Sequence, residues 1–196
     1  MKRILWLVFC LTALPTIQAQ YRLSERGTGL LHLEKHQVTF NLLGPGFRYE
    51  IGLLRNVTAS TSFSPGLATY QEGYTFGYAW HTRIRYYHNI QKRLDANKNV
   101  IGNSANYLAP ARSIFWGKLQ LSQNMAPDKD FAVAFYGGVY GIQRTIKKGF
   151  NYSIEAGYGY YRGDGVLNGH GPMLNFTFGW VATKRRKQQA DFGVSY

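Results

Sequence analysis

The chain has 196 residues and a formal net charge of +13, from 23 Lys and Arg against 10 Asp and Glu. Aromatic residues make up 16% of it and charged residues 17%. So many large apolar groups exclude a disordered chain, and the single cysteine excludes a disulfide scaffold. The positive charge raises the question of a polyanionic partner, which is answered by where the charges lie.

Residues 1–19 have the layout of a secretory signal peptide. Lys2 and Arg3 form a basic start, an apolar run covers 4–14, and a small residue precedes the expected cleavage point. The run is too short for a membrane-spanning helix, which needs about 20 apolar residues. We therefore expect export with a cleavable signal peptide, followed by a leader segment over residues 20–37.

From residue 38 onward, apolar and polar residues alternate with the period of two that is typical of β-strands. In the clearest segment, Phe76 and Ile84 share one face while His81 and Arg83 share the other. Gly, Pro, Asn and Asp between the segments suit chain reversals, and short joints predict antiparallel neighbours. The eight predicted strands are 38–43, 47–53, 57–63, 74–87, 115–122, 131–144, 152–160 and 174–180. The long polar joint 91–110 is expected to contain a short helix at 91–96.

The composition of the two strand faces favours a membrane barrel. A soluble barrel turns its apolar face inward, whereas a membrane barrel turns it toward lipid and fills its lumen with polar groups. The less apolar face here is rich in Gly, Ala and Ser, and its few charges have both signs. Within 131–144 both faces are partly apolar, so the inward face there is ambiguous. The expected lumenal polar network is Arg48, Glu50, His81, Arg83, Arg85, Lys118, Arg144 and Glu155.

Tyrosine and tryptophan gather near the predicted strand ends, as in the interfacial girdles of membrane proteins. The expected interfacial aromatics are Tyr49, Tyr74, Trp80, Tyr86, Trp116, Tyr160 and Trp180. Alternation by itself leaves two alternatives open. One is a soluble secreted or periplasmic lipocalin-like barrel that binds a small apolar ligand, and the other is a narrow channel.

With this pattern the chain resembles the small eight-stranded outer-membrane β-barrel proteins of Gram-negative bacteria. The segments 85–87 (Arg-Tyr-Tyr) and 103–107 (Asn-Ser-Ala-Asn-Tyr) look like those of such proteins from Bacteroidetes. The resemblance implies an all-β, eight-stranded, antiparallel up-and-down transmembrane β-barrel over 38–184 with a filled polar lumen, and a basic periplasmic tail at 185–196. It also implies residence in the outer membrane with both termini on the periplasmic side. We expect a monomer with a structural, anchoring or envelope-interaction role and no enzymatic activity.

The predicted strand order places most of the positive charge on one rim, expected to be periplasmic. Its residues are Lys92, Arg93, Lys98, Lys147, Lys148, Lys184, Arg185, Arg186 and Lys187. Such a rim suits anionic head groups of outer-membrane lipids, phospholipid or lipid A, and the acidic cell wall. Nucleic-acid binding would need basic and stacking aromatic residues interleaved on one face, so no nucleic-acid partner is expected.

The histidines predict no metal site, cofactor or catalytic group. His32 and His36 stand four apart without the remaining ligands of a zinc site. Nucleophilic catalysis needs a serine held beside a histidine, and no spacing fixes one beside His81, His88 or His170.

Overall fold

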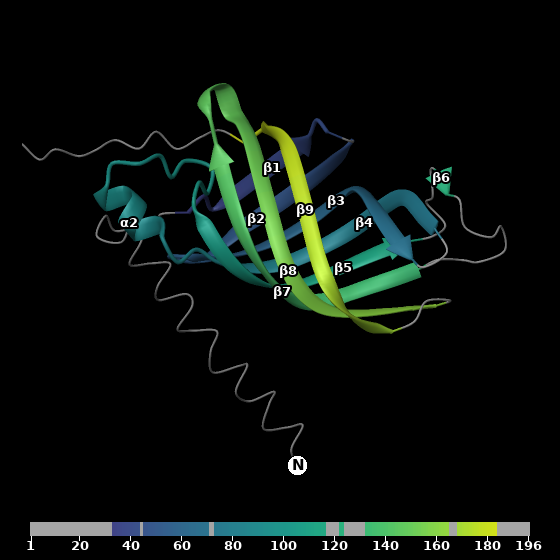
Figure 1. Cartoon of the computed structure of the whole chain (residues 1–196). Helices are drawn as coiled ribbons and strands as arrows, with labels where there is room; N and C mark the ends of the chain where they lie inside the picture. The colour runs from purple at the N-terminus through teal and green to yellow at the C-terminus, as the bar shows by residue number, and fades with distance from the viewer. Residues whose placement is uncertain are drawn as a thin grey trace, which may run out of the picture.

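Eight long antiparallel strands form most of the described chain (Figure 1). The computed structural model describes residues 33–43, 45–70, 73–116, 122–123, 132–164 and 168–183. The long strands are β1 (His36–Asn41), β2 (Gly46–Leu54), β3 (Val57–Tyr70), β4 (Gly73–Tyr86), β5 (Asn106–Trp116), β7 (Ala132–Thr145), β8 (Phe150–Asp164) and β9 (Gly169–Val181). A two-residue strand, β6 (Ser122–Gln123), joins the same sheet beside the start of β4. The expected all-β fold with eight antiparallel, up-and-down strands is confirmed.

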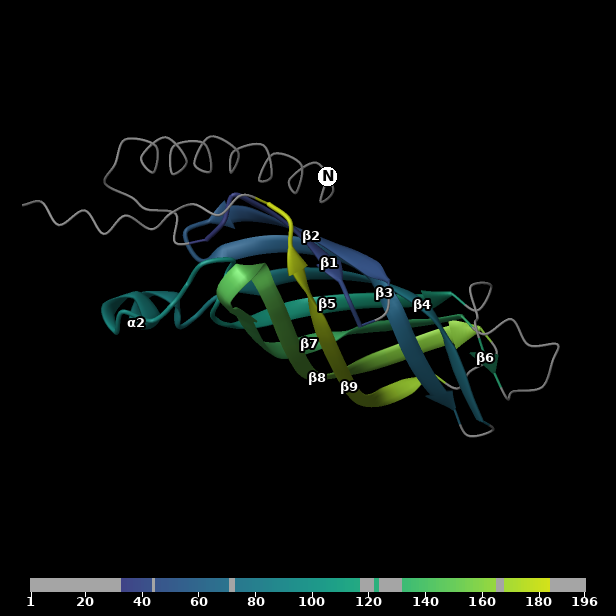
Figure 2. The ribbon, with the colours of Figure 1, turned by 90° about the horizontal axis from the view of Figure 1, so that it is seen from above.

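Consecutive long strands pair with each other, and the first strand also meets the last. Every pairing from β1–β2 to β8–β9 is antiparallel. β1 pairs with β9 over three rungs, from Thr39 opposite Val181 to Asn41 opposite Gly179. Each long strand therefore has a partner on both sides over at least part of its length. Figure 2 shows the resulting strongly curved sheet from above.

The two ends of the sheet differ. Helix α2 (Ile90–Asp95) and the 3-10 turn η2 (Lys147–Gly149) lie where β4 and β7 finish, which we call the α2 end (Figures 1 and 2). The opposite end, where β3 finishes and β4 begins, is called the far end. The helix expected at 91–96 is confirmed. The described residues contain no helix with the length and apolar character that a membrane crossing requires.

Side-chain alternation places polar groups inside the curved sheet and large apolar groups outside it. In β4, His81, Arg83 and Arg85 are buried, whereas Ile84 and Tyr86 between and after them are exposed. The same reversal holds in β2, where Arg48 and Glu50 are buried and Phe47 is exposed, and in β8 and β9. The exposed apolar residues with more than half of their surface free are Leu42, Leu43, Leu67, Ile84, Leu108, Tyr158, Leu174 and Phe176.

The long joint after α2 enters the interior at the α2 end. Val100 and Ala105 belong to the buried apolar cluster, together with Tyr87, which precedes α2, and Ile90, its first residue. Gly102 has a φ of 62°, and an added Cβ would collide with the Thr145 side chain of β7, so only glycine fits this turn. We call residues 99–105 the plug, because their side chains fill the space between the strands at this end.

The fifth strand begins nine residues earlier than the pattern predicted. β5 covers Asn106–Trp116, so residues 106–114, which the pattern had left outside any strand, belong to it. Of the predicted strand 115–122, residues 115–116 lie in β5 and residue 122 in β6, and residues 117–121 lie outside the described residues. Pro110 had suggested a turn. In the sheet it lies where the β4–β5 ladder lacks rungs, between Arg83–Ala111 and Tyr86–Leu108, because proline has no N–H to donate.

Two further joints are shorter than expected. β3 continues through Pro65 and Gly66 to Tyr70, and β8 and β9 extend to Asp164 and from Gly169. β1 likewise begins at His36, inside the predicted leader segment. Glycine and proline had suggested turns at these positions, but inward glycines suit a narrow interior, and proline is tolerated at a strand edge.

Candidate functional site

Two carboxylates and two guanidiniums form ion pairs across the interior. Arg85 of β4 donates through Nη1 to Glu50 Oε2 of β2 at 2.9 Å and through Nη2 to Glu155 Oε1 of β8 at 3.2 Å. Arg83 Nη2 donates to Glu155 Oε2 at 3.4 Å. All four side chains are at most 4% exposed. Because the partners come from opposite parts of the sheet, the pairs tie β2, β4 and β8 together.

Neutral donors complete the coordination of both carboxylates. Glu50 Oε1 accepts from Thr58 Oγ1 and Tyr87 Oη at 2.7 Å each and from Asn103 Nδ2 of the plug at 2.9 Å. Glu155 accepts from Tyr107 Oη at 2.7 Å and from Asn175 Nδ2 at 3.0 Å. Burial, reinforced by the Glu50 charge, raises the pKa of the Tyr87 phenol well above its ordinary value, so it remains a donor.

A glycine makes room for the largest ring of the cluster. Tyr107 projects from β5 across the inner face of β7, and an added Cβ at Gly141 would overlap its ring. The Arg85 guanidinium lies over that ring, 4.5 Å from its centroid. Tyr107 is therefore held by Gly141 on one side, by Arg85 on the other and by Glu155 at its hydroxyl.

Arg48 is the guanidinium of this interior that takes part in none of the described ion pairs. It is 4% exposed and donates through Nη2 to Asn151 Oδ1 at 2.5 Å. Within the described residues, Nε of Arg48, Arg83 and Arg85 also has no hydrogen-bond partner. Among the described residues, three buried arginines therefore face two buried carboxylates.

A histidine and a serine of the cluster lie within hydrogen-bond distance of each other. Ser113 Oγ of β5 lies 2.8 Å from His81 Nδ1 and accepts from Arg83 Nη2 at 3.1 Å. No spacing in the sequence had paired His81 with a serine, and the strand register does so by setting Ser113 opposite it. A catalytic histidine also needs a carboxylate bonded to its other nitrogen, and the described residues provide none to His81.

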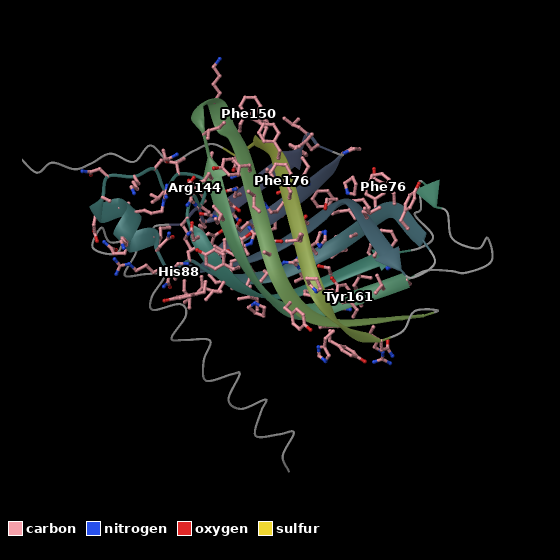
Figure 3. All side chains as sticks on the ribbon, in the orientation of Figure 1. Phe76, His88, Arg144, Phe150, Tyr161 and Phe176 are labelled. Carbon is pink, nitrogen blue, oxygen red and sulfur yellow. The ribbon has the colours of Figure 1, made fainter. Side chains whose placement is uncertain are left out.

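Six of the eight residues expected in the lumenal network come together here: Arg48, Glu50, His81, Arg83, Arg85 and Glu155. Arg144 does not, and its expected place is corrected. The alternation of β7 turns Gln143 and Thr145 inward, and Arg144 donates on the other face to Asn106 Oδ1 at 2.6 Å, near α2 (Figure 3). Lys118 lies outside the described residues.

Several members of the cluster carried no recognisable sequence signal. They come from the plug, from strand ends and from the inner faces of β1, β7 and β8: Gln37, Tyr87, Asn103, Tyr107, Gln143 and Asn151. Each is uncharged, and all but Gln37, which donates to Thr39 two residues away, make a hydrogen bond to a distant part of the chain. In β4 and β8 the sequence shows which residues turn inward. Carrying that alternation across to the strands paired with them is what could have placed Tyr107 and Gln143 inside.

The expected basic rim is partly visible at the α2 end. Lys92 and Arg93 lie in the last turn of α2, where they complement its dipole. Lys98 follows the helix, and Lys147 and Lys148 belong to η2. Lys184, Arg185, Arg186 and Lys187 lie outside the described residues.

The seven expected interfacial aromatics all lie on the outer face of strands. Tyr74, Tyr86, Trp116, Tyr160 and Trp180 are exposed, and Tyr49 and Trp80 are half-buried. Trp80 packs edge-on against Trp116 at 6.4 Å, and Trp180 Nε1 donates to Lys148 O at 3.0 Å. Phe76 and Phe176, labelled in Figure 3, belong to the same outer face.

A small pocket of about 10 Å³, enough for about one water molecule, borders the cluster. It is lined by Asn41, Arg48, Ser62, His81, Arg83, Arg85, Glu155, Asn175 and Thr177. The lining is polar throughout. The described residues contain no group of three or more side chains arranged to hold a metal ion. Searches against protein-family models, curated proteins and solved structures find no match to this chain.

Proposed function

We propose that the protein is an integral outer-membrane β-barrel with a structural, anchoring or envelope-interaction role and no enzymatic activity. One observation carries the proposal, namely that the sheet is polar inside and apolar outside. Leu174 is 82% exposed while Glu50 and Gln143 are fully buried. This is the arrangement of a barrel whose outer face meets hydrocarbon.

Strand pairing supports closure of the sheet into that barrel. A membrane-spanning sheet needs partners for the backbone groups of every strand, because hydrocarbon offers none. The eight long strands each pair on both sides over part of their length, and three rungs between β1 and β9 join the first strand to the last. Eight strands enclose an interior that side chains can fill, as the ion-paired cluster and the plug do here.

The outer apolar surface is too continuous for a soluble monomer. Exposed large apolar residues occur on all eight long strands and on the β1–β2 turn, whereas soluble monomers rarely expose apolar patches above a few hundred Å². A lipocalin-like carrier would also need an apolar lumen for its ligand. The interior here instead holds five charged side chains and a polar pocket.

A narrow channel agrees less well with the interior. The Glu50–Arg85–Glu155–Arg83 pairs run across the lumen, and the plug adds Asn103 to the same cluster. An ion would have to break these contacts to pass. We propose that the α2 end faces the periplasm, where its basic residues approach anionic head groups.

The test is fractionation and gel migration of the full chain. We expect the protein in the outer-membrane fraction, extracted only by detergent, with faster gel migration when unboiled than when boiled. A protein that stays soluble without detergent after secretion would refute the proposal, as would one whose migration is unaffected by heating.

A further inference from the structure

The outer face of the sheet carries a small polar site at the α2 end, centred on Arg144. This side chain is half-buried and projects from the outer face of β7. Its Nη2 donates to Asn106 Oδ1 of β5 at 2.6 Å, and its Nη1 donates to Gln143 O at 2.7 Å. An arginine has five N–H groups, so these two contacts fix the orientation of the guanidinium and leave donors for a further acceptor.

Neighbouring side chains hold this arginine in a fixed frame. Asn106 Nδ2 donates to Tyr140 Oη at 2.7 Å, and the His88 ring packs at a tilt on the Tyr140 ring, with centroids 5.7 Å apart. Asn106 N donates to Asn89 Oδ1, next to the start of α2, at 2.8 Å. Figure 3 labels Arg144 and His88 at this end of the sheet. The site is therefore preorganised by contacts within the chain.

A second cation lies near the first. Arg93 of α2 is half-buried, and its Nε and Nη2 both donate to Asn99 O, at 3.3 and 2.8 Å. Of the charged groups in the described residues, Arg93 repels Arg144 most strongly, and neither arginine belongs to a described ion pair. Asp95, the acidic residue of α2, accepts from Gln91. Two cations held in this way favour an anion that contacts both.

Toward the far end, the same outer face becomes apolar at once. Leu108, which pairs with Tyr140, is 53% exposed, and Ile154, which pairs with Ile142, is 46% exposed. Tyr86 of β4, opposite Leu108, is also exposed. In the proposed barrel these side chains face hydrocarbon. The two arginines therefore lie where the outer face changes from apolar to polar, which is the level of phospholipid head groups.

We propose that this place on the outer face, which we call the Arg144 site, binds an anionic phospholipid. Its phosphate lies between Arg144 and Arg93, and its acyl chains lie along Leu108 and Ile154. The planar guanidinium matches the geometry of phosphate oxygens, whereas a phosphocholine head would bring its own cation beside Arg93. This inference rests on the proposed membrane location. It adds to the general attraction of the basic rim a lipid class and the residues that recognise it.

The test is native mass spectrometry of the full chain, released from micelles that contain either dioleoylphosphatidylglycerol or dioleoylphosphatidylcholine. Only samples with heat-modifiable gel migration are used, so failure of the lipid site is distinguished from failure of the barrel. We expect one phosphatidylglycerol to be retained per chain under conditions that remove phosphatidylcholine. Inorganic phosphate, added alone, should bind far more weakly because it lacks the acyl chains.

Two variants remove the cations of the site, and a third is the matched control. Arg144→Gln should weaken phosphatidylglycerol binding about tenfold, the effect of one lost charge-assisted hydrogen bond. Arg144→Lys keeps the charge but not the planar fork and should recover part of that loss. Arg93→Gln should also weaken binding, because the second cation is gone. Arg112→Gln removes an exposed arginine on the outer face of β5, beside Tyr136, and should leave binding unchanged.

Three results would overturn the inference. The first is a failure to retain phosphatidylglycerol in preference to phosphatidylcholine. The second is equal loss of binding in Arg144→Gln and Arg112→Gln, which would indicate adsorption driven by overall charge. The third is binding of inorganic phosphate as tight as that of the lipid, because the anion would then be recognised without its chains.

Discussion

Gly141 offers the sharpest test of how the interior is packed. A Cβ added there would overlap Cζ, Cε2 and Oη of Tyr107. That ring has no easy escape, because its hydroxyl donates to Glu155 at 2.7 Å and the Arg85 guanidinium lies against its face. Gly141→Ala must therefore displace the ring and break a charge-assisted hydrogen bond.

Over-packing a filled interior costs about 1–3 kcal/mol, and a hydrogen bond to a charged group contributes about 1.5–3 kcal/mol. We expect Gly141→Ala to lower the free energy of unfolding by about 2–3 kcal/mol, toward the upper part of the over-packing range. Gly138→Ala is the matched control on the same strand, since an added Cβ there meets no atom within 4 Å. That change should be neutral or stabilise by up to about 1 kcal/mol through the unfolded chain.

The assay is urea unfolding of the vesicle-reconstituted protein, followed by tryptophan fluorescence and unboiled gel migration. The double variant Gly141→Ala/Tyr107→Leu should lose less stability than the sum of its single changes, because removing the ring removes the overlap. Equal stability of the Gly141 and Gly138 variants, or strict additivity in the double variant, would refute the reasoning about the Tyr107 contact.

Three further predictions follow from the same contacts. Glu155→Gln leaves Arg83 and part of Arg85 without a counter-charge, and breaking such a buried pair should cost about 3–5 kcal/mol in urea unfolding; a loss below 1 kcal/mol would contradict the described ion pairs. Arg144→Gln, in the same assay, should lower the free energy of unfolding by less than about 1 kcal/mol because this side chain lies outside the buried cluster. A loss as large as that of Glu155→Gln would mean that Arg144 does belong to the buried network. Leu174→Arg should cost about 2–4 kcal/mol in vesicles if it lies near the bilayer midplane, whereas a neutral effect would place Leu174 in water.

The sequence pattern was most informative where the two faces of a strand differ in size and charge. β4 alternates large apolar residues with His81, Arg83 and Arg85, so both its position and its orientation could be predicted. In β7 the inner face carries Phe135 and Val139 and the outer face carries Tyr136 and Tyr140. With apolar residues on both faces, the sequence does not show which face of β7 turns inward, and Arg144 was therefore assigned to the wrong side.

Strand β5 shows a second limit. Its inner face is built from Tyr107, Ala109 and Ala111, and small inward residues give little contrast with a polar loop. Pro110 then appears as a chain breaker, although in the sheet it only removes one donor from a ladder that continues on both sides of it.

The plug could not be predicted from local pattern at all. Its segment has no periodicity, and its contacts reach far along the chain, as in the hydrogen bond from Asn103 to Glu50. Such contacts depend on the curvature of the whole sheet.

The central claim is that the outer face of the sheet contacts hydrocarbon, and spin labelling along β4 tests it most directly. Single nitroxide labels at Phe76, Tyr78, Ile84 and Tyr86, in vesicle-reconstituted protein, should be accessible to dissolved oxygen and protected from a water-soluble nickel chelate. Labels at Gly77 and Ala79, on the inner face, should be protected from both. High nickel accessibility at Tyr78 and Ile84 would contradict the account, because it would place the outer face of β4 in water.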